Sequence, residues 1–412
     1  MSRPPLLSLD DALVQLLQHA HPLDGVDSVS TFDADGRVLA QDVISALQVP
    51  PQDNSSMDGY AVRSSDCQQA GAVLRVTQRI PAGSHGSPLG IGEAARIFTG
   101  APIPEGADAV VMQEEALAQE GDCVCIQGVP AAGQWIRRSG EDVTRGACVL
   151  QRGARLTSAA LGLAASIGLA KLQVARRPRV ALFSTGDELV MPGDVAPQDM
   201  PPGAIYNSNR FFLRSMLMRL GCEVSDLGIV PDQREATIRA LQLAAQDHDL
   251  ILTSGGVSVG EEDHIKPAVQ ALGELNLWQL AIKPGKPFAY GHLQRGNASR
   301  CHFMGLPGNP VSSFVTFLLL VRPFLLALQG ATQLQPWRQH MVAHFDWPRA
   351  DKRREFLRVR RNAQGGLDLF PNQSSGVLTS AVWGDGVVDN PAGHTIAAGD
   401  VVSFIAWSEW LS

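Results

Sequence analysis

The sequence lacks both an excess of positive charge and a long uninterrupted hydrophobic run. Its 412 residues include 34 Lys and Arg against 41 Asp and Glu, and a net charge of −7 gives no electrostatic basis for binding nucleic acid. The most hydrophobic run, residues 313–328, contains Arg322 and Pro323 and is shorter than the roughly 20 residues that a membrane span needs. Asp10 and Asp11 interrupt the apolar residues near the N-terminus, so no secretory signal is expected. We therefore expect a soluble, cytoplasmic protein without a nucleic-acid or membrane partner.

Cysteine and histidine pairs with metal-binding spacing are also missing. The six cysteines form no C-x-x-C pair, and Cys123 and Cys125 would point to the same side of one strand. This pattern excludes a zinc ribbon and a disulfide framework, and it agrees with a reducing compartment. The ten histidines show no spacing typical of metal ligands, and no Ser–His–Asp or Cys–His set can be assembled.

What the chain does contain is frequent Gly (40) and Pro (26) between short elements, over a length that favours two to four domains. Residues 9–20 predict a helix with Ser8 as its N-cap, and residues 27–150 predict short alternating strands. Residues 156–172 predict a second helix that begins at Thr157 or Ser158.

From residue 176 onward, continuous apolar strands alternate with helices expected at 207–220, 233–247, 264–272 and 310–328. After residue 329 the pattern returns to short strands, which predict a small β-barrel or sandwich. The fold expected is multidomain α/β plus β: a doubly wound, mostly parallel sheet with β-rich flanking domains and a C-terminal β-barrel. The domain boundaries expected are 1–45 with 147–175, 46–146, 176–328 and 329–412.

Ligands of doubly wound sheets bind at the carboxyl ends of the strands. One such loop, "TSGGVSVG", offers successive backbone N–H groups that can bind phosphate, although it matches neither a Rossmann nor a P-loop motif. The alternative is a tight strand–helix turn. We favour phosphate binding by Ser254, Gly255, Gly256 and Ser258.

Two aspartates follow strands of the same sheet, Asp232 after one and Asp263 after the next. Hard cations take carboxylate and phosphate oxygens together, so this pair indicates Mg²⁺. Their loops would be neighbours only if the two strands are adjacent, and each aspartate taken alone is better explained as a helix N-cap.

Positive charge is concentrated in "KPGKP", where Lys283 and Lys286 lie on a proline-flanked turn. Two ammonium groups held so close repel each other unless an anion lies between them. "GLPGNPVSS" presents Asn309 and Ser312 at the start of a helix, which fits either anion binding or simple capping. Most of the basic run "KRREFLRVRR" is expected to be a solvated strand face.

The stretch "DNSSMDGYAV" (53–62) combines turn-forming residues with an apolar Met57 and an acidic Asp58. It fits either a hairpin corner or a loop that presents Asp58 to a partner. These residues alone leave the two alternatives open.

The motifs together resemble those of the molybdopterin molybdenumtransferase family, which includes the bacterial MoeA proteins and the E domain of gephyrin-like proteins. The resemblance is carried, in order, by "DNSSMDGYAV", "RIFTGAPIPEGADAVVMQE", "STGDEL", "GAIYNSN", "TSGGVSVGEEDHIK", "AIKPGKPFAYG" and "GLPGNPVSS". It implies an elongated homodimer with an active site between subunits, in which molybdate and adenylylated molybdopterin react with the help of Mg²⁺ and release AMP. It also implies contact with the adenylyltransferase and with recipient apoenzymes.

The resemblance assigns roles to individual positions. Those implied to be catalytic are Asp58, Thr99, Asp142 and Glu188, and those implied to bind metal are Asp232 and Asp263. Those expected to bind substrate are Arg137, Ser254, Gly255, Gly256, Ser258, Lys283, Lys286, Asn309, Ser312, Arg358 and Ser375. Three departures are visible: Gln279 where some relatives have Lys, Asn207 where Asp is frequent, and an approximate match of "NQSSG" that leaves Ser374 as an alternative to Ser375.

Three other functions are compatible with parts of this pattern. An adenylyltransferase would need only the sheet domain, and the flanking β-domains argue against it. A gephyrin-like scaffold would be expected to have a linker and a second sheet domain. An inactive paralogue is disfavoured by the intact Asp58, Asp232, Asp263, Lys283 and Lys286.

Overall fold

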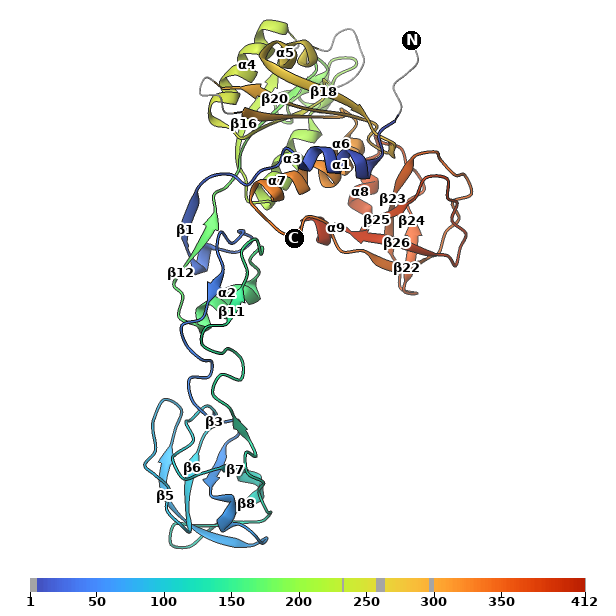
Figure 1. Ribbon diagram of the computed structural model, residues 1–412. Helices are drawn as coiled ribbons and strands as arrows, with labels where there is room; N and C mark the ends of the chain where they lie inside the picture. Colours follow the sequence, from blue (N-terminus) through green and yellow to red (C-terminus); the bar gives the residue numbers. More distant parts are fainter. Residues whose placement is uncertain (1–5, 232, 257–263, 296–299, 412) are drawn as a thin grey trace.

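The computed structural model describes residues 6–231, 233–256, 264–295 and 300–411, and it shows an elongated molecule (Figure 1). A β-rich unit that carries β3–β10 lies at one end. The α/β unit and the C-terminal barrel lie side by side at the other end, and a slender segment with β1, β12, α2 and β11 connects the two (Figure 1).

The α/β unit is built on one six-stranded sheet in which four neighbouring strands pair in parallel and the last two are added by antiparallel pairing, so that only β20 runs in the opposite direction. In spatial order the strands are β16 (Glu223–Val230), β13 (Arg179–Thr185), β17 (Leu250–Ser254), β21 (Arg300–Leu306), β20 (Pro287–Gln294) and β18 (Gly273–Gln279). The predicted mostly parallel sheet is confirmed.

Helices cover both faces of this sheet. Its strands carry apolar side chains on both faces, so both faces must be buried. In β13, Val180 and Leu182 belong to one hydrophobic core, whereas Ala181 and Phe183 belong to the other. The first core is completed by α1 (Leu9–Leu17), α3 (Ser208–Arg219), α6 (Pro310–Thr316) and α7 (Arg322–Leu328), and the second by α4 (Arg234–Asp247) and α5 (Ile265–Leu272). The doubly wound architecture is therefore confirmed.

The long apolar helix expected at 310–328 contains a π-helical segment, Phe317–Val321, between α6 and α7. Within the described ranges, this is the one helix whose length and composition would allow it to cross a membrane. However, 83% of its most apolar window is buried inside the protein. The apolar side chains of this helix thus belong to the hydrophobic core, and no membrane span is indicated.

The C-terminal unit is a closed five-stranded barrel, as predicted. Its strands follow the order β23 (Arg354–Arg361), β24 (Gly366–Leu369), β22 (Gln339–Ala343), β26 (Val401–Ala406) and β25 (Gly386–Asn390), and β25 pairs back onto β23. A short strand from the α/β unit, β19 (Ile282–Lys283), adds in parallel to the start of β23. This pairing joins the "KPGKP" turn to the barrel.

Two short helices of the C-terminal unit were not predicted. They are α8 (Thr379–Trp383) and α9 (Trp407–Leu411). Both are only five residues long, too short to produce a helical hydrophobic period in the sequence.

The N-terminal half is built from small sheets. A six-stranded sheet contains β4 (Gly59–Val62), β5 (Ala72–Ile80), β6 (Glu93–Ile97), β7 (Ala109–Met112), β8 (Ala116–Gln119) and β9 (Cys123–Ile126). The connecting segment pairs β1 (Val26–Ser30) with β12 (Lys171–Ala175), and β2 (Val43–Ile44) with β11 (Cys148–Leu150).

The helix expected at 156–172 is shorter in the structure. It is α2 (Ser158–Ser166), with Thr157 as its N-cap, and Gly168 follows in the left-handed region at φ +83°. The residues after Gly168 are needed in β12, so strand pairing overrides the helical pattern there.

Candidate functional site

The sheet has its topological switch point at β13. Strands β16 and β17 pair with opposite edges of β13, so the loops after β13 and β17 meet where ligands of doubly wound sheets bind. The predicted magnesium ligands follow β16 and β17, and these strands are not adjacent because β13 lies between them. Asp232 and Asp263 themselves, and Ser258, lie outside the described residues.

The turn after β17 is pressed against the end of β13. Gly255 and Gly256 have φ values of +91° and +67°, in the left-handed region. A Cβ on Gly255 would lie 2.8 Å from the Thr185 carbonyl oxygen, and one on Gly256 would lie 2.9 Å from Thr185 Oγ1. Only glycine fits both positions, so the turn is a fixed cradle of backbone groups.

One side chain that sequence reasoning missed connects three of these loops. Asn209, in the first turn of α3, donates from Nδ2 to Ser254 Oγ (2.8 Å) and to the Gly308 carbonyl (2.7 Å). It is 8% exposed. Its position in "GAIYNSN" was visible in the sequence, but its partners lie 45 and 99 residues away.

Replacing Gly255 by Ala is expected to destabilise the protein by roughly 2 kcal/mol, because the added methyl meets the Thr185 backbone at a left-handed residue. Urea unfolding measures this effect. Gly308→Ala is the matched control, because its Cβ would contact nothing within 4 Å. Equal behaviour of the two variants would contradict this expectation.

Glu188 lies in the loop that follows β13 and is exposed to solvent. Its carboxylate folds back over Gly186, where a Cβ would lie 2.6 Å from the nearer oxygen. Asn207, one of the departures, is 2% exposed and accepts a capping hydrogen bond from the Arg210 N–H (3.3 Å). Its Nδ2 has no hydrogen-bond partner among the described residues.

The "KPGKP" turn packs directly against α6, between Ser312 and Thr316. Gly285, at φ +106°, lies so close to Thr316 that a Cβ would collide with its hydroxyl oxygen, and the same Cβ would lie 3.4 Å from the Ser312 carbonyl. The Val311 N–H donates to the Ser375 carbonyl (2.9 Å), so the "NQSSG" turn also reaches this helix start. Asn309 occupies the N-cap position, but its side chain makes no capping hydrogen bond.

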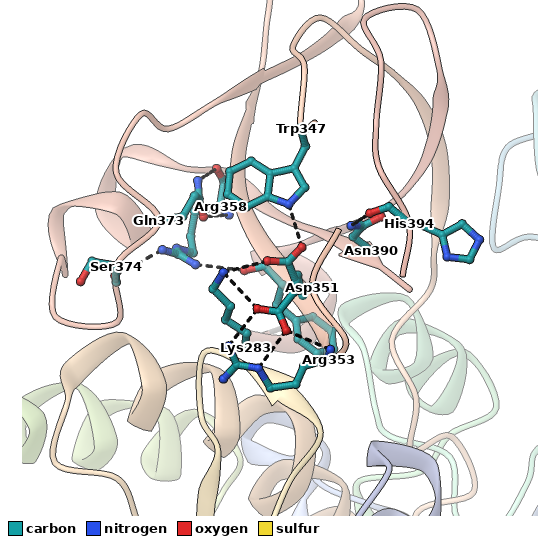
Figure 2. Close-up of polar contacts among 11 residues, drawn as sticks. Lys283, Trp347, Asp351, Arg353, Arg358, Gln373, Ser374, Asn390 and His394 are labelled. Carbon is teal, nitrogen blue, oxygen red and sulfur yellow. Dashed lines mark hydrogen bonds and ion pairs between the residues drawn. The ribbon is translucent and has the colours of Figure 1, made fainter. Parts of the chain in front are cut away.

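The sequence suggested two neighbouring ammonium groups, Lys283 and Lys286, with no counterion from the protein. In the structure, Lys283 forms ion pairs. Its Nζ lies 3.0 Å from Glu355 Oε1 and 3.5 Å from Asp351 Oδ2, and Trp347 presents its ring 5.8 Å away. Figure 2 shows the Lys283 ammonium group directed toward Asp351, with Trp347 on the far side of the cluster and Arg358 beside it. The Lys286 ammonium group has no hydrogen-bond or salt-bridge partner in the part of the chain that the structure describes, although the Lys286 carbonyl accepts a hydrogen bond from the Leu280 N–H (2.7 Å).

Arg358 corrects the interpretation of the basic run as a solvated face. Residues 355–359 of β23 are buried, because the strand closes the barrel and both of its sides are covered. The Arg358 guanidinium is 1% exposed, and burial lowers its pKa to about 10.

The partners of Arg358 are uncharged. Its guanidinium donates to Ser380 Oγ (3.1 Å), the Phe356 carbonyl (3.1 Å) and the Ser374 carbonyl (3.3 Å). Across the described ranges, no carboxylate lies within ion-pair distance of it. Among the described residues, Arg358 is thus a buried positive charge without a counterion, three residues along β23 from Glu355, the partner of Lys283 (Figure 2).

The Asp58 carboxylate is exposed to solvent and is held in place by hydrogen bonds. Its Oδ1 accepts hydrogen bonds from the Thr99 backbone N–H and hydroxyl, both at 2.7 Å. These two bonds, with a smaller contribution from the nearby Arg96 guanidinium, hold the pKa of Asp58 below its usual value. Asp58 is fully exposed, and Ser55 Oγ fixes the loop by donating to the Met57 carbonyl (2.6 Å).

Two other predicted residues lie in the same half of the molecule. Arg137 belongs to β10 (Ile136–Arg137), which pairs with β3 (Asn54–Ser55) at the base of the Asp58 loop. Asp142 is exposed and donates its N–H to the Val49 carbonyl (2.9 Å) in the segment that leads toward α2. The structure therefore brings Asp58 and Thr99 together and places Arg137 on the adjoining strand pair.

A single chain does not bring this acidic group to the cationic one. The strands next to Asp58, β3 and β4, lie at one end of the elongated molecule, and β23 with its buried arginine lies at the other (Figure 1). Among the described residues, no group of three His, Cys, Asp or Glu side chains could hold a metal ion.

Comparison with known proteins gives matches along most of the chain. Residues 7–168 match the family described as the MoeA N-terminal region (domain I and II), residues 181–327 a probable molybdopterin binding domain, and residues 340–407 the MoeA C-terminal region (domain IV). A Haemophilus influenzae protein named molybdopterin molybdenumtransferase is 42% identical over 368 residues, which cover 88% of this chain and 89% of the relative.

Other relatives cover nearly the whole chain. A Synechococcus elongatus protein with the same name is 36% identical, over 96% of this chain and 98% of its own length. The crystal structure of a molybdopterin biosynthesis moeA protein from Pyrococcus horikoshii OT3 superposes with a TM-score of 0.83 at 27% identity, covering 98% of this chain and all of that one.

Proposed function

Because this chain belongs to the molybdopterin molybdenumtransferase family and is an enzyme of molybdenum cofactor biosynthesis, we propose that it joins molybdate to adenylylated molybdopterin with Mg²⁺-assisted release of AMP. The observation that carries this proposal is the buried, uncompensated Arg358 guanidinium beside Lys283. Such a charge is costly unless an anion offsets it. A tetrahedral oxyanion dianion such as molybdate supplies the missing negative charge.

The residues around this charge have the donor types that an oxyanion needs. Lys283 and Lys286 carry ammonium groups, and the start of α6 with Ser312 contributes the positive end of a helix. The Ser375 turn is tied to that helix start through Val311. We assign molybdate to this cluster and the phosphate groups of the pterin to the glycine turn at Ser254–Gly256.

We include Mg²⁺ in the proposal because the loops after β16 and β17 contain side chains that bind this cation. Each loop contains an aspartate, Asp232 and Asp263, and hard carboxylate oxygens are the ligands that this cation prefers together with phosphate. Because β13 lies between β16 and β17, a cation held by both loops would span the end of β13, and Mg²⁺ bound there would neutralise charge on the phosphoanhydride that breaks. Glu188, exposed in the loop after β13, keeps in this proposal the catalytic role that the family resemblance implies.

We assign the active form as a homodimer. Within one chain the Asp58–Thr99 group and the Lys283–Arg358 cluster lie at opposite ends, so a site that uses both needs a second copy. Asp58 and Thr99, with Arg137 and Asp142 behind them, then approach the reactants from the partner and position them. The presented loop with its low-pKa carboxylate supports this role.

Four further points belong to the same proposal. The domain boundaries are those expected from the sequence. Separate hydrophobic cores support the connecting segment, the N-terminal β-rich unit and the barrel, whereas one core joins α1 and part of the barrel to the α/β unit. The enzyme works in the cytoplasm, and it exchanges its pterin with the adenylyltransferase that precedes it and with the apoenzymes that receive the product.

The test is AMP release from adenylylated molybdopterin, measured with and without molybdate and Mg²⁺ and followed by reconstitution of a cofactor-free apoenzyme. Molybdate-dependent AMP release with active cofactor formed supports the proposal. Transfer of AMP from ATP to free molybdopterin would move the assignment to the adenylyltransferase reaction. Neither activity would leave a binding or scaffolding protein.

A further inference from the structure

The two carboxylates that contact the Lys283 ammonium group differ sharply in their burial. The Glu355 side chain is 1% exposed, whereas that of Asp351 is 21% exposed and that of Lys283 39%. They approach the ammonium group at 3.0 and 3.5 Å, respectively. One carboxylate is therefore enclosed by protein, and the other is at the solvent side of the cluster.

Glu355 cannot release Lys283 without leaving a buried charge. Its Oε2 accepts one hydrogen bond, from Trp347 Nε1 (2.7 Å), and its Oε1 is bound by Lys283. Removing one partner of a buried ion pair costs far more than the pair itself contributes, because the remaining charge stays desolvated. Parallel pairing of β19 with β23 also sets Lys283 directly opposite Glu355.

Asp351 has a second cation of its own. Arg353 donates to it from Nε (3.1 Å), Nη2 (2.9 Å) and its backbone N–H (3.0 Å). The Arg353 hydrogen bonds hold the pKa of Asp351 well below its usual range, so it stays ionised wherever the enzyme is folded. If the Asp351 carboxylate moves away from Lys283, it remains paired and partly solvated.

We propose that Asp351 is a built-in competitor of the oxyanion substrate at Lys283, and that Glu355 is the positioning residue that holds Lys283 in place while the substrate displaces Asp351. This inference rests on the proposed function, since it takes the Lys283–Arg358 cluster as the oxyanion site.

The arrangement of these charged groups favours anions that carry more negative charge. A monoanion would exchange one negative charge on Lys283 for another and gain little. A dianion has a stronger Coulomb attraction to Lys283 than a monoanion has, and the counterion-free Arg358 on the same strand as Glu355 adds to the positive charge that it meets. The site therefore favours tetrahedral dianions over monoanions of similar size.

The experiment is calorimetric titration of the full-length protein with sodium molybdate, together with kcat and KM for molybdate. Asp351→Asn is expected to bind molybdate about three- to fivefold more tightly, the range that corresponds to a partly exposed ion pair. Asp351→Glu, which keeps the charge, should retain wild-type affinity. Glu355→Gln keeps the Trp347 hydrogen bond and is expected to lower kcat about tenfold.

Asp385→Asn is the matched control for net charge, because it lies at the opposite end of β23, where it accepts a hydrogen bond from the Arg361 N–H. The inference is overturned if Asp351→Asn binds molybdate no more tightly than the wild type or than Asp385→Asn, or if Glu355→Gln keeps full kcat. Absence of molybdate binding by the wild-type protein would instead overturn the oxyanion site itself, so the two failures can be told apart.

Discussion

A mixture of Asp58→Asn and Lys283→Ala chains is expected to regain about a quarter of wild-type activity, although each variant alone is inactive. Random exchange of subunits makes half of the dimers mixed. If Asp58 of one chain serves the Lys283 cluster of the other, each mixed dimer has one intact site and one doubly defective site. The elongated chain, with the two groups at opposite ends, is the reason for expecting this arrangement (Figure 1).

The measurement is AMP release after the two purified variants have been mixed under conditions that allow subunit exchange, compared with each variant alone. A double variant that carries both substitutions in one chain, mixed with wild-type chains, is the control for exchange. Recovery indistinguishable from zero, with exchange demonstrated by mass spectrometry of the mixed dimers, would place both residues in one subunit or remove one of them from the site.

The Asp58→Asn substitution is suited to this test because it preserves the shape of the loop. An amide oxygen can still accept the two hydrogen bonds from Thr99, so the turn should remain folded. Only the negative charge is lost, and Asp58 is fully exposed, so no effect on folding is expected. Lost activity with an unchanged dimer therefore reports on the charge that the loop presents.

The fold could be predicted because its strongest signals are local. Val180 to Phe183 alternate between two cores, and this produces the continuous apolar run that indicated a parallel sheet covered on both faces. Helix α2 was predicted too long because Lys171 to Ala175 pair with β1, some 145 residues earlier in the chain. That pairing has no trace in the helical pattern of residues 156–172.

The sequence indicated the positively charged residues of the site but not the residues that form ion pairs with them. Lys283 and Lys286 were conspicuous between prolines, but Glu355 and Asp351 come from a different unit about 70 residues later. They meet Lys283 because β19 adds to the barrel at β23, a pairing that is set by tertiary packing. Asn209 was missed for the same reason, since its hydrogen bonds join three loops that are distant in sequence.

Replacing Arg358 by Met is expected to reduce molybdate-dependent activity by about 100-fold or more, because the substitution removes the buried charge that the oxyanion offsets. Arg358 is 1% exposed, and burial lowers its pKa to about 10, so the empty site holds a charge that is destabilised by its surroundings. Wild-type protein should therefore be stabilised by molybdate in thermal unfolding, and Arg358→Met should show no such rise in melting temperature.

Arg361→Met is the matched control for this prediction. Arg361 belongs to the same strand, but its side chain is 53% exposed and lies 3.5 Å from Asp385, so it already has a counterion. The control should keep both its activity and its stabilisation by molybdate. If Arg358→Met retained either property at the wild-type level, the guanidinium would be a purely structural clamp that holds Ser374 and Ser380, and the oxyanion would have to bind without it.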